Sequence, residues 1–394
     1  MPENSFEYKV SLIKCGSYDP AEVETAVKKA VDLIGGIAHF IKPDETVLLK
    51  PNLLSDVTPE KGIDTHPEVV RAVIRLIRPI TKNIFCGDSP SVWGKKKDIE
   101  RVYEISGIRR ICDEEKVRLI YFSDPVVKNG YPMADWAFKC DRLINIPKFK
   151  THGLTVLTAG LKNLFGLIIG LHKMKIHREN PLPADLSKAI VDIYQFRKPD
   201  LNILDGVMAM EGQGPGSTGT LKKMSLVSAA SDALCMDMVL SSVMKIGVSD
   251  VPTNKEALSR GLGPGSFSSI EVCGEDIKVF QCSDFKLPKS SILVKIPSWG
   301  LNIISALLTF RPFINPLKCK ACGICMKICP VGAISLVRGK FVIDKKICIL
   351  CLCCQEVCPH ASIDIKKSLF MRVLSYRPLK SFKEAFPRVS REEK

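Results

Sequence analysis

Two cysteine-rich stretches, CKACGICMKICP (319–330) and CILCLCCQEVCP (348–359), decide the fold of the C-terminal part of the chain. Each has the spacing C-x2-C-x2-C-x3-C-P. In such runs the first three cysteines hold one iron–sulfur cubane, and the fourth reaches across to the other cubane. The spacing therefore predicts two [4Fe-4S] clusters, the first held by Cys319, Cys322, Cys325 and Cys358 and the second by Cys348, Cys351, Cys354 and Cys329.

The ninth cysteine of this region, Cys353, has no place in the spacing, so we expect it to be a spare thiol beside a cluster. Zinc is the alternative occupant, but tetrahedral zinc sites use two cysteine pairs separated by a loop, whereas continuous runs followed by proline favour iron and sulfur. Over residues 316–366, with every ligand position filled, the segment resembles bacterial-type two-cluster ferredoxins. The resemblance implies a small α+β ferredoxin-like domain.

Composition narrows the class of protein. The chain has 394 residues and sixteen cysteines, and its N-terminus has no apolar segment of signal-peptide type. Dense cysteine without a secretory context indicates metal binding and a cytoplasmic protein. No apolar stretch is long enough to cross a bilayer, so we expect no transmembrane segment.

The formal net charge of +15 indicates an anionic partner, although a lysine-rich surface of thermophile type explains the charge equally well. Nucleic acid, a membrane surface, an acidic protein and an anionic small molecule all fit this charge. No nucleic-acid recognition motif is present, so we expect no nucleic-acid partner.

The first 290 residues alternate between strand and helix patterns, which predicts an α/β domain with a mostly parallel sheet covered by helices. Residues 291–315 are expected to connect this domain to the ferredoxin-like domain, and residues 367–394 to form a basic tail. The expected strands are 46–51, 83–86, 117–122, 142–146, 201–204 and 225–228, and the expected helices include 20–34, 68–77, 155–169, 184–196 and 232–245.

Polar residues gather where the expected strands end, which is where ligands bind in open parallel sheets. Three of these clusters, Lys50-Pro51-Asn52, Lys148-Phe149-Lys150-Thr151-His152 and Gly160-Leu161-Lys162-Asn163, resemble motifs of the family known as domain of unknown function 362, over residues 10–279. Members of that family often carry a two-cluster ferredoxin module. The resemblance supports the architecture and implies no reaction.

The leading hypothesis is a ferredoxin-linked oxidoreductase that passes electrons from its clusters to an anionic small substrate, with a soluble protein as electron donor or acceptor. Lys148, Lys150 and His152 are the candidate catalytic residues, with His152 as a proton donor. Lys50, Asn52, Lys162 and Asn163 are the candidate substrate-binding residues. The alternative is a non-enzymatic electron-transfer or assembly protein that docks a partner.

A glycine-rich loop, Gly214-Pro215-Gly216-Ser217-Thr218-Gly219, formally matches G-x-G-x-x-G. The dinucleotide fingerprint requires a helix to begin at these glycines, whereas the residues that follow predict a strand. We therefore expect no dinucleotide site at this loop.

Overall fold

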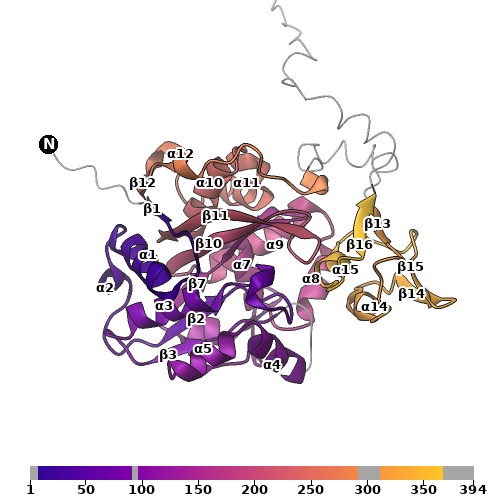
Figure 1. Cartoon of the computed structure of the whole chain (residues 1–394), viewed down its shortest axis with the longest axis horizontal. Helices are drawn as coiled ribbons and strands as arrows, with labels where there is room; N and C mark the ends of the chain where they lie inside the picture. Colours follow the sequence, from indigo (N-terminus) through magenta and orange to yellow (C-terminus); the bar gives the residue numbers. More distant parts are fainter. Residues whose placement is uncertain (1–7, 91–95, 292–310, 367–394) are drawn as a thin grey trace, which may run out of the picture.

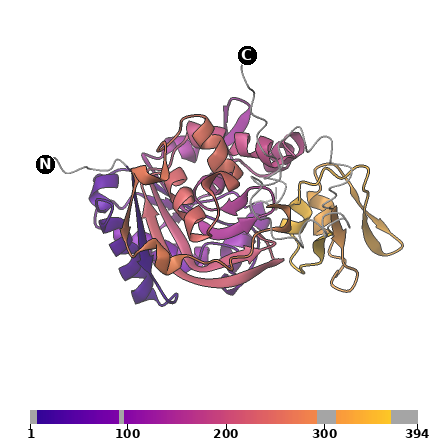
Figure 2. The same cartoon turned by 90° about the horizontal axis from the view of Figure 1, so that it is seen from above.

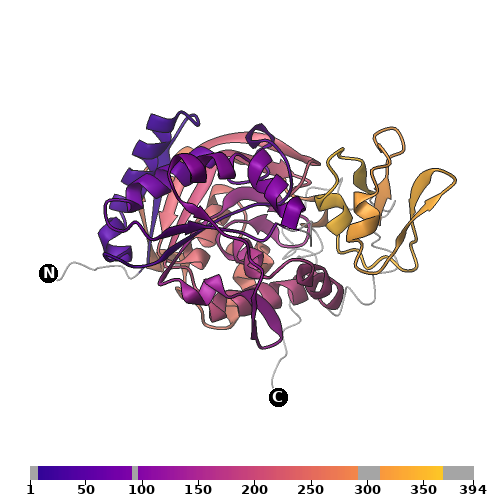
Figure 3. The ribbon, with the colours of Figure 1, turned by 90° about the horizontal axis from the view of Figure 1, so that it is seen from below.

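The computed structural model describes residues 8–90, 96–291 and 311–366. Within them the chain forms a large α/β domain with a small cysteine-rich module at one end, as the three ribbon views show (Figures 1, 2 and 3). Most of the predicted connecting segment (292–310) and the whole basic tail (367–394) lie outside the described residues.

A ten-stranded mixed sheet forms the centre of the described α/β domain, with the strand order β12-β1-β11-β10-β7-β2-β3-β4; in addition, β8 pairs with β10, and β9 pairs with β8. Pairing is parallel except between β1 and β11, β10 and β11, and β8 and β9. The predicted mostly parallel α/β fold is thus confirmed. The strands are β1 (Tyr8–Lys14), β2 (Val47–Pro51), β3 (Ile84–Cys86), β4 (Arg118–Leu119), β7 (Arg142–Ile146), β8 (Lys148–His152), β9 (Val156–Thr158), β10 (Leu201–Gly212), β11 (Gly219–Ala230) and β12 (Ile270–Gly274).

Helices cover both faces of this sheet because its strands are apolar on both sides. On β2, Leu48 packs into one core, whereas Val47 and Leu49 pack into the core on the other face. Such two-sided burial is typical of strands in covered parallel sheets. One face is covered by α1 (Pro20–Asp32), α3 (Pro67–Ile77), α4 (Lys96–Ile105) and α5 (Ile108–Glu114), and the other by α7 (Gly160–Asn163), α9 (Pro183–Phe196), α10 (Ala233–Val243) and α11 (Pro252–Ser259).

The predicted helix 155–169 is wrong in its first third and at its last two residues. Residues 156–158 form β9, which pairs antiparallel with β8 and places Thr158 opposite Lys150. The sequence Thr155-Val156-Leu157-Thr158 is rich in β-branched residues, which favour a strand. Only α7 (Gly160–Asn163) and a 3-10 turn (Leu164–Leu167) are helical, and the buried Asp237 accepts hydrogen bonds from the first two backbone amides of α7.

The cysteine-rich module contains two small antiparallel pairs and two short helices. The elements are β13 (Arg311–Ile314), α14 (Ile324–Ile328), β14 (Ile334–Val337), β15 (Lys340–Ile343), α15 (Cys353–Glu356) and β16 (Ile363–Lys366), with β13 paired to β16 and β14 to β15. The two cysteine runs have matching backbones, because Ala321 and Leu350 both have a positive φ, as do Gly323 and Leu352.

The long β10–β11 hairpin extends from the α/β domain to this module (Figure 2). Gly216, in the connecting loop, lies directly against the backbone of Glu356, and a Cβ at this position would clash with the Glu356 carbonyl oxygen. Close packing against the cysteine-rich module therefore explains why this loop has a glycine at position 216. A strand follows it, as expected, and no helix begins there.

Candidate functional site

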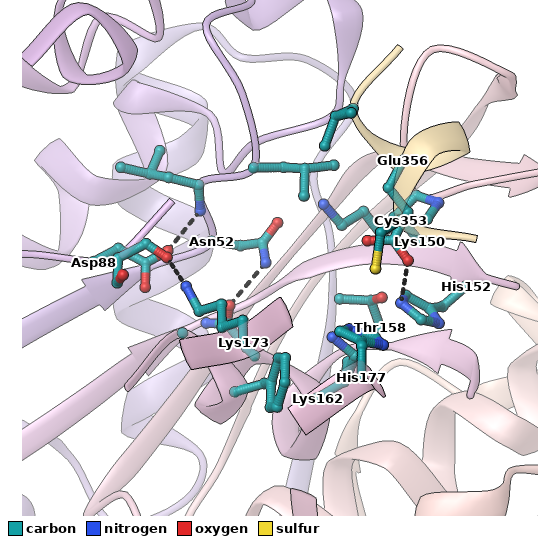
Figure 4. A pocket seen from close by; sticks show the side chains of 18 of the residues that line it. Asn52, Asp88, Lys150, His152, Thr158, Lys162, Lys173, His177, Cys353 and Glu356 are labelled. Atoms are coloured by element: carbon teal, nitrogen blue, oxygen red, sulfur yellow. Dashed lines mark hydrogen bonds and ion pairs between the residues drawn. The ribbon is translucent and has the colours of Figure 1, made fainter. Parts of the chain in front are cut away.

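A cavity of about 70 Å³ lies where the cysteine-rich module meets the carboxyl ends of the sheet strands (Figure 4). A volume of this size holds a few water molecules or a small ligand. One wall comes from the α/β domain and includes Asn52, Lys150, His152, Thr158, Lys162, Asn163, Lys173 and His177; the opposite wall comes from the module and includes Ile328, Cys353, Glu356 and Val357.

Three lysines point their ammonium groups towards this cavity, and we call them the cavity lysines: Lys150, Lys162 and Lys173. Lys150 Nζ donates to the carbonyl oxygen of Ile63 at 2.7 Å, and Lys173 Nζ donates to the carbonyl oxygen of Ser89. Lys162 Nζ lies 4.6 Å from the ring centre of Phe165. Within the described residues, none of the three has a carboxylate within 4 Å.

Burial makes these lysines easier to deprotonate. It lowers the pKa of Lys150 to about 8, although the carboxylate of Asp64 opposes the shift, and it lowers the pKa of Lys173 to about 7. The pKa of Lys162 is also lowered by burial, against the attraction of Glu356. Loss of solvation penalises the charged form of each group, so an anion in the cavity would offset part of that penalty.

The other two predicted lysines do not line the cavity. Lys50 Nζ lies 2.8 Å from Asp88 Oδ1, and Lys148 Nζ lies 2.8 Å from Asp205 Oδ2, with all four side chains buried. Lys148 also donates to the hydroxyl of Tyr18 at 2.7 Å. These two lysines form paired structural charges at the same edge of the sheet, so only two of the four predicted lysines line the pocket.

Gly166 makes the Lys50–Asp88 pair possible. A Cβ at this position would clash with the Asp88 carboxylate and with Lys50 Nζ. Asp88 also accepts a hydrogen bond from the backbone amide of Leu53 at 2.9 Å, which fixes the chain just after Asn52. The glycine thus allows the buried ion pair to support the wall of the cavity.

A chain of side-chain amides holds Asn52 and Asn163 in place. Asn52 Nδ2 donates to Asn163 Oδ1 at 2.8 Å, and Asn163 Nδ2 donates to Asn145 Oδ1 at 2.8 Å. Asn145 in turn donates to Asn202 Oδ1 at 2.9 Å. Because each amide fixes the next, the chain orients Asn52 Oδ1, which has no hydrogen-bond partner among the described residues.

His152 is held in one neutral tautomer. Its Nδ1 accepts hydrogen bonds from the backbone amides of Leu154 and Thr155 at 3.1 and 3.2 Å, so the ring proton is on Nε2. Nε2 lies 3.1 Å from Glu356 Oε1, which joins the two modules across the cavity (Figure 4). Burial lowers the pKa of His152, in agreement with a neutral ring. In this arrangement His152 orients Glu356 and holds no additional proton.

Two further buried polar atoms face the cavity without a hydrogen-bond partner in the described structure, namely Thr158 Oγ1 and His177 Nδ1. An unpaired buried polar atom costs about 1–3 kcal/mol, so such atoms at a cavity indicate a ligand or ordered water. Burial lowers the pKa of His177 to about 4, which keeps its imidazole neutral. His172, five residues earlier, is exposed, so the two histidines do not converge.

Sequence analysis did not select Thr158, Lys173, His177 or Glu356 as site residues. The sequence contains a signal for two of these residues: His177 follows a polar segment, and Glu356 lies within the second cysteine run. Nothing in the sequence gives the angle at which the module docks, and that angle brings Glu356 and Cys353 to the cavity. The roles predicted for Lys148, Lys150, His152, Lys50, Asn52, Lys162 and Asn163 stay predictions.

The cysteines of the module gather in two groups. A second, smaller cavity is lined by Cys329, Cys348, Cys351 and Cys354, the set that the spacing assigns to one cubane. In the other group, burial raises the pKa of the Cys325 thiol to about 11, with further increases from the nearby thiols of Cys358, Cys322 and Cys319. The backbone amides of Ala333 and Ser362 point at the sulfurs of Cys329 and Cys358 at 3.2 and 3.4 Å, as amides do around cluster sulfurs.

Comparison with known proteins identifies both parts. Residues 47–242 match the model of the domain of unknown function DUF362, and residues 312–335 match a 4Fe-4S binding domain. A thylakoid-associated protein of Synechocystis sp. is 32% identical over 262 residues, which cover 65% of this chain and 80% of that protein. The chain belongs to the DUF362 family. This DUF362 protein is also an iron–sulfur protein that binds a [4Fe-4S] cluster.

Two further observations describe this DUF362 protein. A crystal structure of a Thermotoga maritima protein is 14% identical and covers 49% of this chain and 51% of its own, with a TM-score of 0.31, too low to define a shared fold. Among the described residues, no helix combines the length and the apolar character needed to cross a membrane.

Proposed function

We propose that this DUF362 protein is a ferredoxin-linked oxidoreductase, which transfers electrons through two [4Fe-4S] clusters to a small anionic substrate in the interface cavity. The main support for the proposal is that the two domains contribute different kinds of residue to the two walls of the interface cavity. The α/β domain supplies the cavity lysines, and the cysteine-rich module supplies Cys353 and Glu356. Cys353 lies between Cys351 and Cys354, two predicted ligands of one cluster, so that cluster would adjoin the cavity.

Eight of the nine cysteines of the two runs, all except Cys353, are the proposed ligands, with Cys329 and Cys358 each completing the cluster of the other run. The cavity lined by Cys329, Cys348, Cys351 and Cys354 supports this crossed assignment, because Cys329 belongs to the first run and the others to the second. When bound, the clusters supply single electrons at low potential. The sixteen cysteines form no disulfide in the described structure, which also supports a reducing, cytoplasmic location.

The cavity lysines would hold the anionic group of the substrate. Lys162 is the strongest candidate for direct contact, because its ammonium lies against the ring of Phe165, whereas those of Lys150 and Lys173 already donate to backbone carbonyl oxygens. Asn52 Oδ1 and Thr158 Oγ1 would orient the polar groups that the anion presents to them. A ligand that satisfies these atoms removes the cost of leaving them unpaired.

The same lysines would supply protons. Reduction of an organic substrate by two electrons consumes protons, and an efficient proton donor has a pKa near the working pH. Lys173 and Lys150, with pKa values near 7 and 8, meet this requirement. His152, whose Nδ1 accepts two backbone hydrogen bonds, would instead position Glu356. We therefore assign proton donation to the lysines and an orienting role to His152.

The test is ligand-dependent reoxidation of the reduced protein. Anaerobically reconstituted, reduced protein is mixed with small carboxylates and phosphate esters, and the visible absorbance of the clusters is followed. A substrate should reoxidise the wild type, and Lys162→Ala should weaken its binding by about 10- to 100-fold, because a charged hydrogen bond is lost.

Lys175→Ala, on the same helix as Lys173 but exposed, is the matched control and should behave as wild type. If no anion reoxidises the clusters but a protein partner does, the oxidoreductase proposal fails and the non-enzymatic electron-transfer alternative takes its place.

A further inference from the structure

The two cysteine groups of the module differ in exposure. The first group contains the exposed Cys322, whereas the second group (Cys329, Cys348, Cys351 and Cys354) has no exposed member. Cys353, between Cys351 and Cys354 in the sequence, lines the interface cavity. Phe341, on the β14–β15 hairpin, lies beside Gly323 of the first cysteine run. This hairpin is the part of the module farthest from the α/β domain (Figures 1 and 3). The first cysteine group therefore adjoins the outer side of the module.

This outer side is strongly basic. We define the outer face by six exposed residues of the first cysteine run and the hairpin: Leu317, Lys318, Lys320, Lys327, Arg338 and Lys340. Lys345 and Lys346 are also exposed, whereas Asp344 is the one exposed acidic residue among residues 311–365. Such a charge pattern steers negatively charged partners and accelerates their association.

The outer face also presents apolar area. Leu317 is 92% exposed, and Met326 and Val342 are 41% and 48% exposed. Apolar side chains surrounded by charges of one sign are typical of a docking surface, where the apolar atoms give contact area and the charges give orientation.

From the charge, the apolar area and the exposed cysteine group, we infer that the outer face is the docking site of an acidic one-electron carrier protein. This inference rests on the proposed role of the clusters as an electron relay. Electrons would enter at the cluster near Cys319 and Cys322 and leave at the cluster beside the interface cavity. Each transfer oxidises one carrier molecule and reduces one cluster by one electron, so no atoms are exchanged.

The test measures how fast a photoreduced acidic plant-type ferredoxin reduces the clusters of the full chain by anaerobic stopped flow. The wild-type rate constant should fall steeply as salt is added, because salt screens attraction between the surfaces. The double variant Lys327→Glu/Lys340→Glu should be about tenfold slower at low ionic strength.

The matched control, Lys28→Glu/Lys188→Glu, changes the net charge equally at exposed sites on the α/β domain and should stay near wild type. Iron content and reduction by dithionite verify that the clusters of each variant are intact.

Three results would overturn the docking site: a wild-type rate that does not depend on salt, equal rates in the two double variants, or loss of binding to phosphatidylserine vesicles in the outer-face variant with unchanged ferredoxin kinetics. The last result would assign the face to a membrane surface. None of these measurements needs a substrate in the cavity, so failure of the proposed reaction and failure of the docking site are distinguishable.

Discussion

Two sets of lysines lie at the same edge of the sheet, and they differ in what neutralises them. Lys50 and Lys148 each have a buried carboxylate at 2.8 Å. The cavity lysines have carbonyl oxygens or an aromatic ring instead. A buried ion pair is balanced by the protein itself, whereas a buried ammonium without a carboxylate is balanced only when an anion arrives. The difference separates two lysines whose charge is neutralised within the protein from three that the proposed function assigns to anion binding.

The largest expected effect is on the paired set. Asp205→Asn should lower the free energy of unfolding by about 3–5 kcal/mol, because it leaves the buried Lys148 without its charge partner. Denaturant unfolding of the two proteins measures the difference. Asp32→Asn, which breaks the exposed pair with Lys28, is the control and should have little effect. A similar small effect at Asp205 would show that the two sets of lysines do not differ in the proposed way.

The next effect concerns the contact between the loop that connects β10 to β11 and the cysteine-rich module. Gly216→Ala should destabilise the docked module by about 1–3 kcal/mol, because the new methyl group clashes with the Glu356 backbone. Faster hydrogen exchange in residues 348–359 would measure this. Gly265→Ala, where a Cβ meets no atom within 4 Å, is the matched control and should be silent. Unchanged exchange in Gly216→Ala would mean that the loop does not hold the module.

A smaller expected effect is the pH dependence of anion binding by the cavity lysines. Lys173 and Lys150 are protonated below their pKa values of about 7 and about 8, so anion binding should be strongest at low pH and weaken as the pH rises through this window. Sulfate, which does not itself titrate there, should bind about tenfold more weakly at pH 9 than at pH 6. Calorimetry measures the affinity. Lys173→Met should flatten the lower part of this profile, and a wild-type affinity that is independent of pH would contradict it.

Removal of a cavity lysine should hardly change stability. Lys162→Met removes a half-buried charge that has no carboxylate within 4 Å among the described residues, so the free energy of unfolding should stay the same or rise by about 1 kcal/mol. A parallel measurement on Lys50→Met, which leaves Asp88 unpaired, should show a large loss instead. If both variants lost stability equally, Lys162 would belong with the structural set.

The smallest expected effect is none. Cys353→Ser should leave the iron content at about eight per chain, because Cys353 falls outside the ligand spacing. Iron and sulfide analysis after anaerobic reconstitution measures this. Cys351→Ser is the positive control and should lose iron. A loss of about four irons in Cys353→Ser would shift the ligand register by one residue.

The fold could be predicted wherever one local signal was sufficient. Residues 142–146 form β7, and the helix pattern from residue 68 gives α3, because apolar periodicity alone determines both elements. Residues 156–158 form a strand within the predicted helix 155–169, because the pairing of Thr158 with Lys150 and the contact of Gly160 with Ala233 are long-range. Sequence periodicity contains no information on either contact.

The sequence predicts where the candidate site lies, but it does not predict which of the lysines there have a carboxylate partner. The motifs predict Lys50, Lys148, Lys150 and Lys162 at one edge of the sheet, and only Lys150 and Lys162 of these line the interface cavity. Whether a lysine has a carboxylate partner depends on Asp88 and Asp205, which follow or lie on other strands. Lys173 and Glu356 enter the site through the packing of α8 (His172–Glu179) and of the module, and neither packing leaves a local signal in the sequence.

The position of Cys353 has a mechanical consequence. Consecutive Cα atoms are about 3.8 Å apart, so this thiol is covalently tethered to the neighbouring cluster ligand Cys354. If the module moves relative to the α/β domain, the Cys353 thiol moves with the module, while Lys150, Lys162 and Lys173 stay with the sheet. The distance between the Cys353 thiol and the proposed cluster would thus change little, whereas the distance between this thiol and the lysines would vary with the docking of the module. Any motion that loosens the Glu356–His152 contact would therefore change the distance between the proposed cluster and an anion held by the lysines.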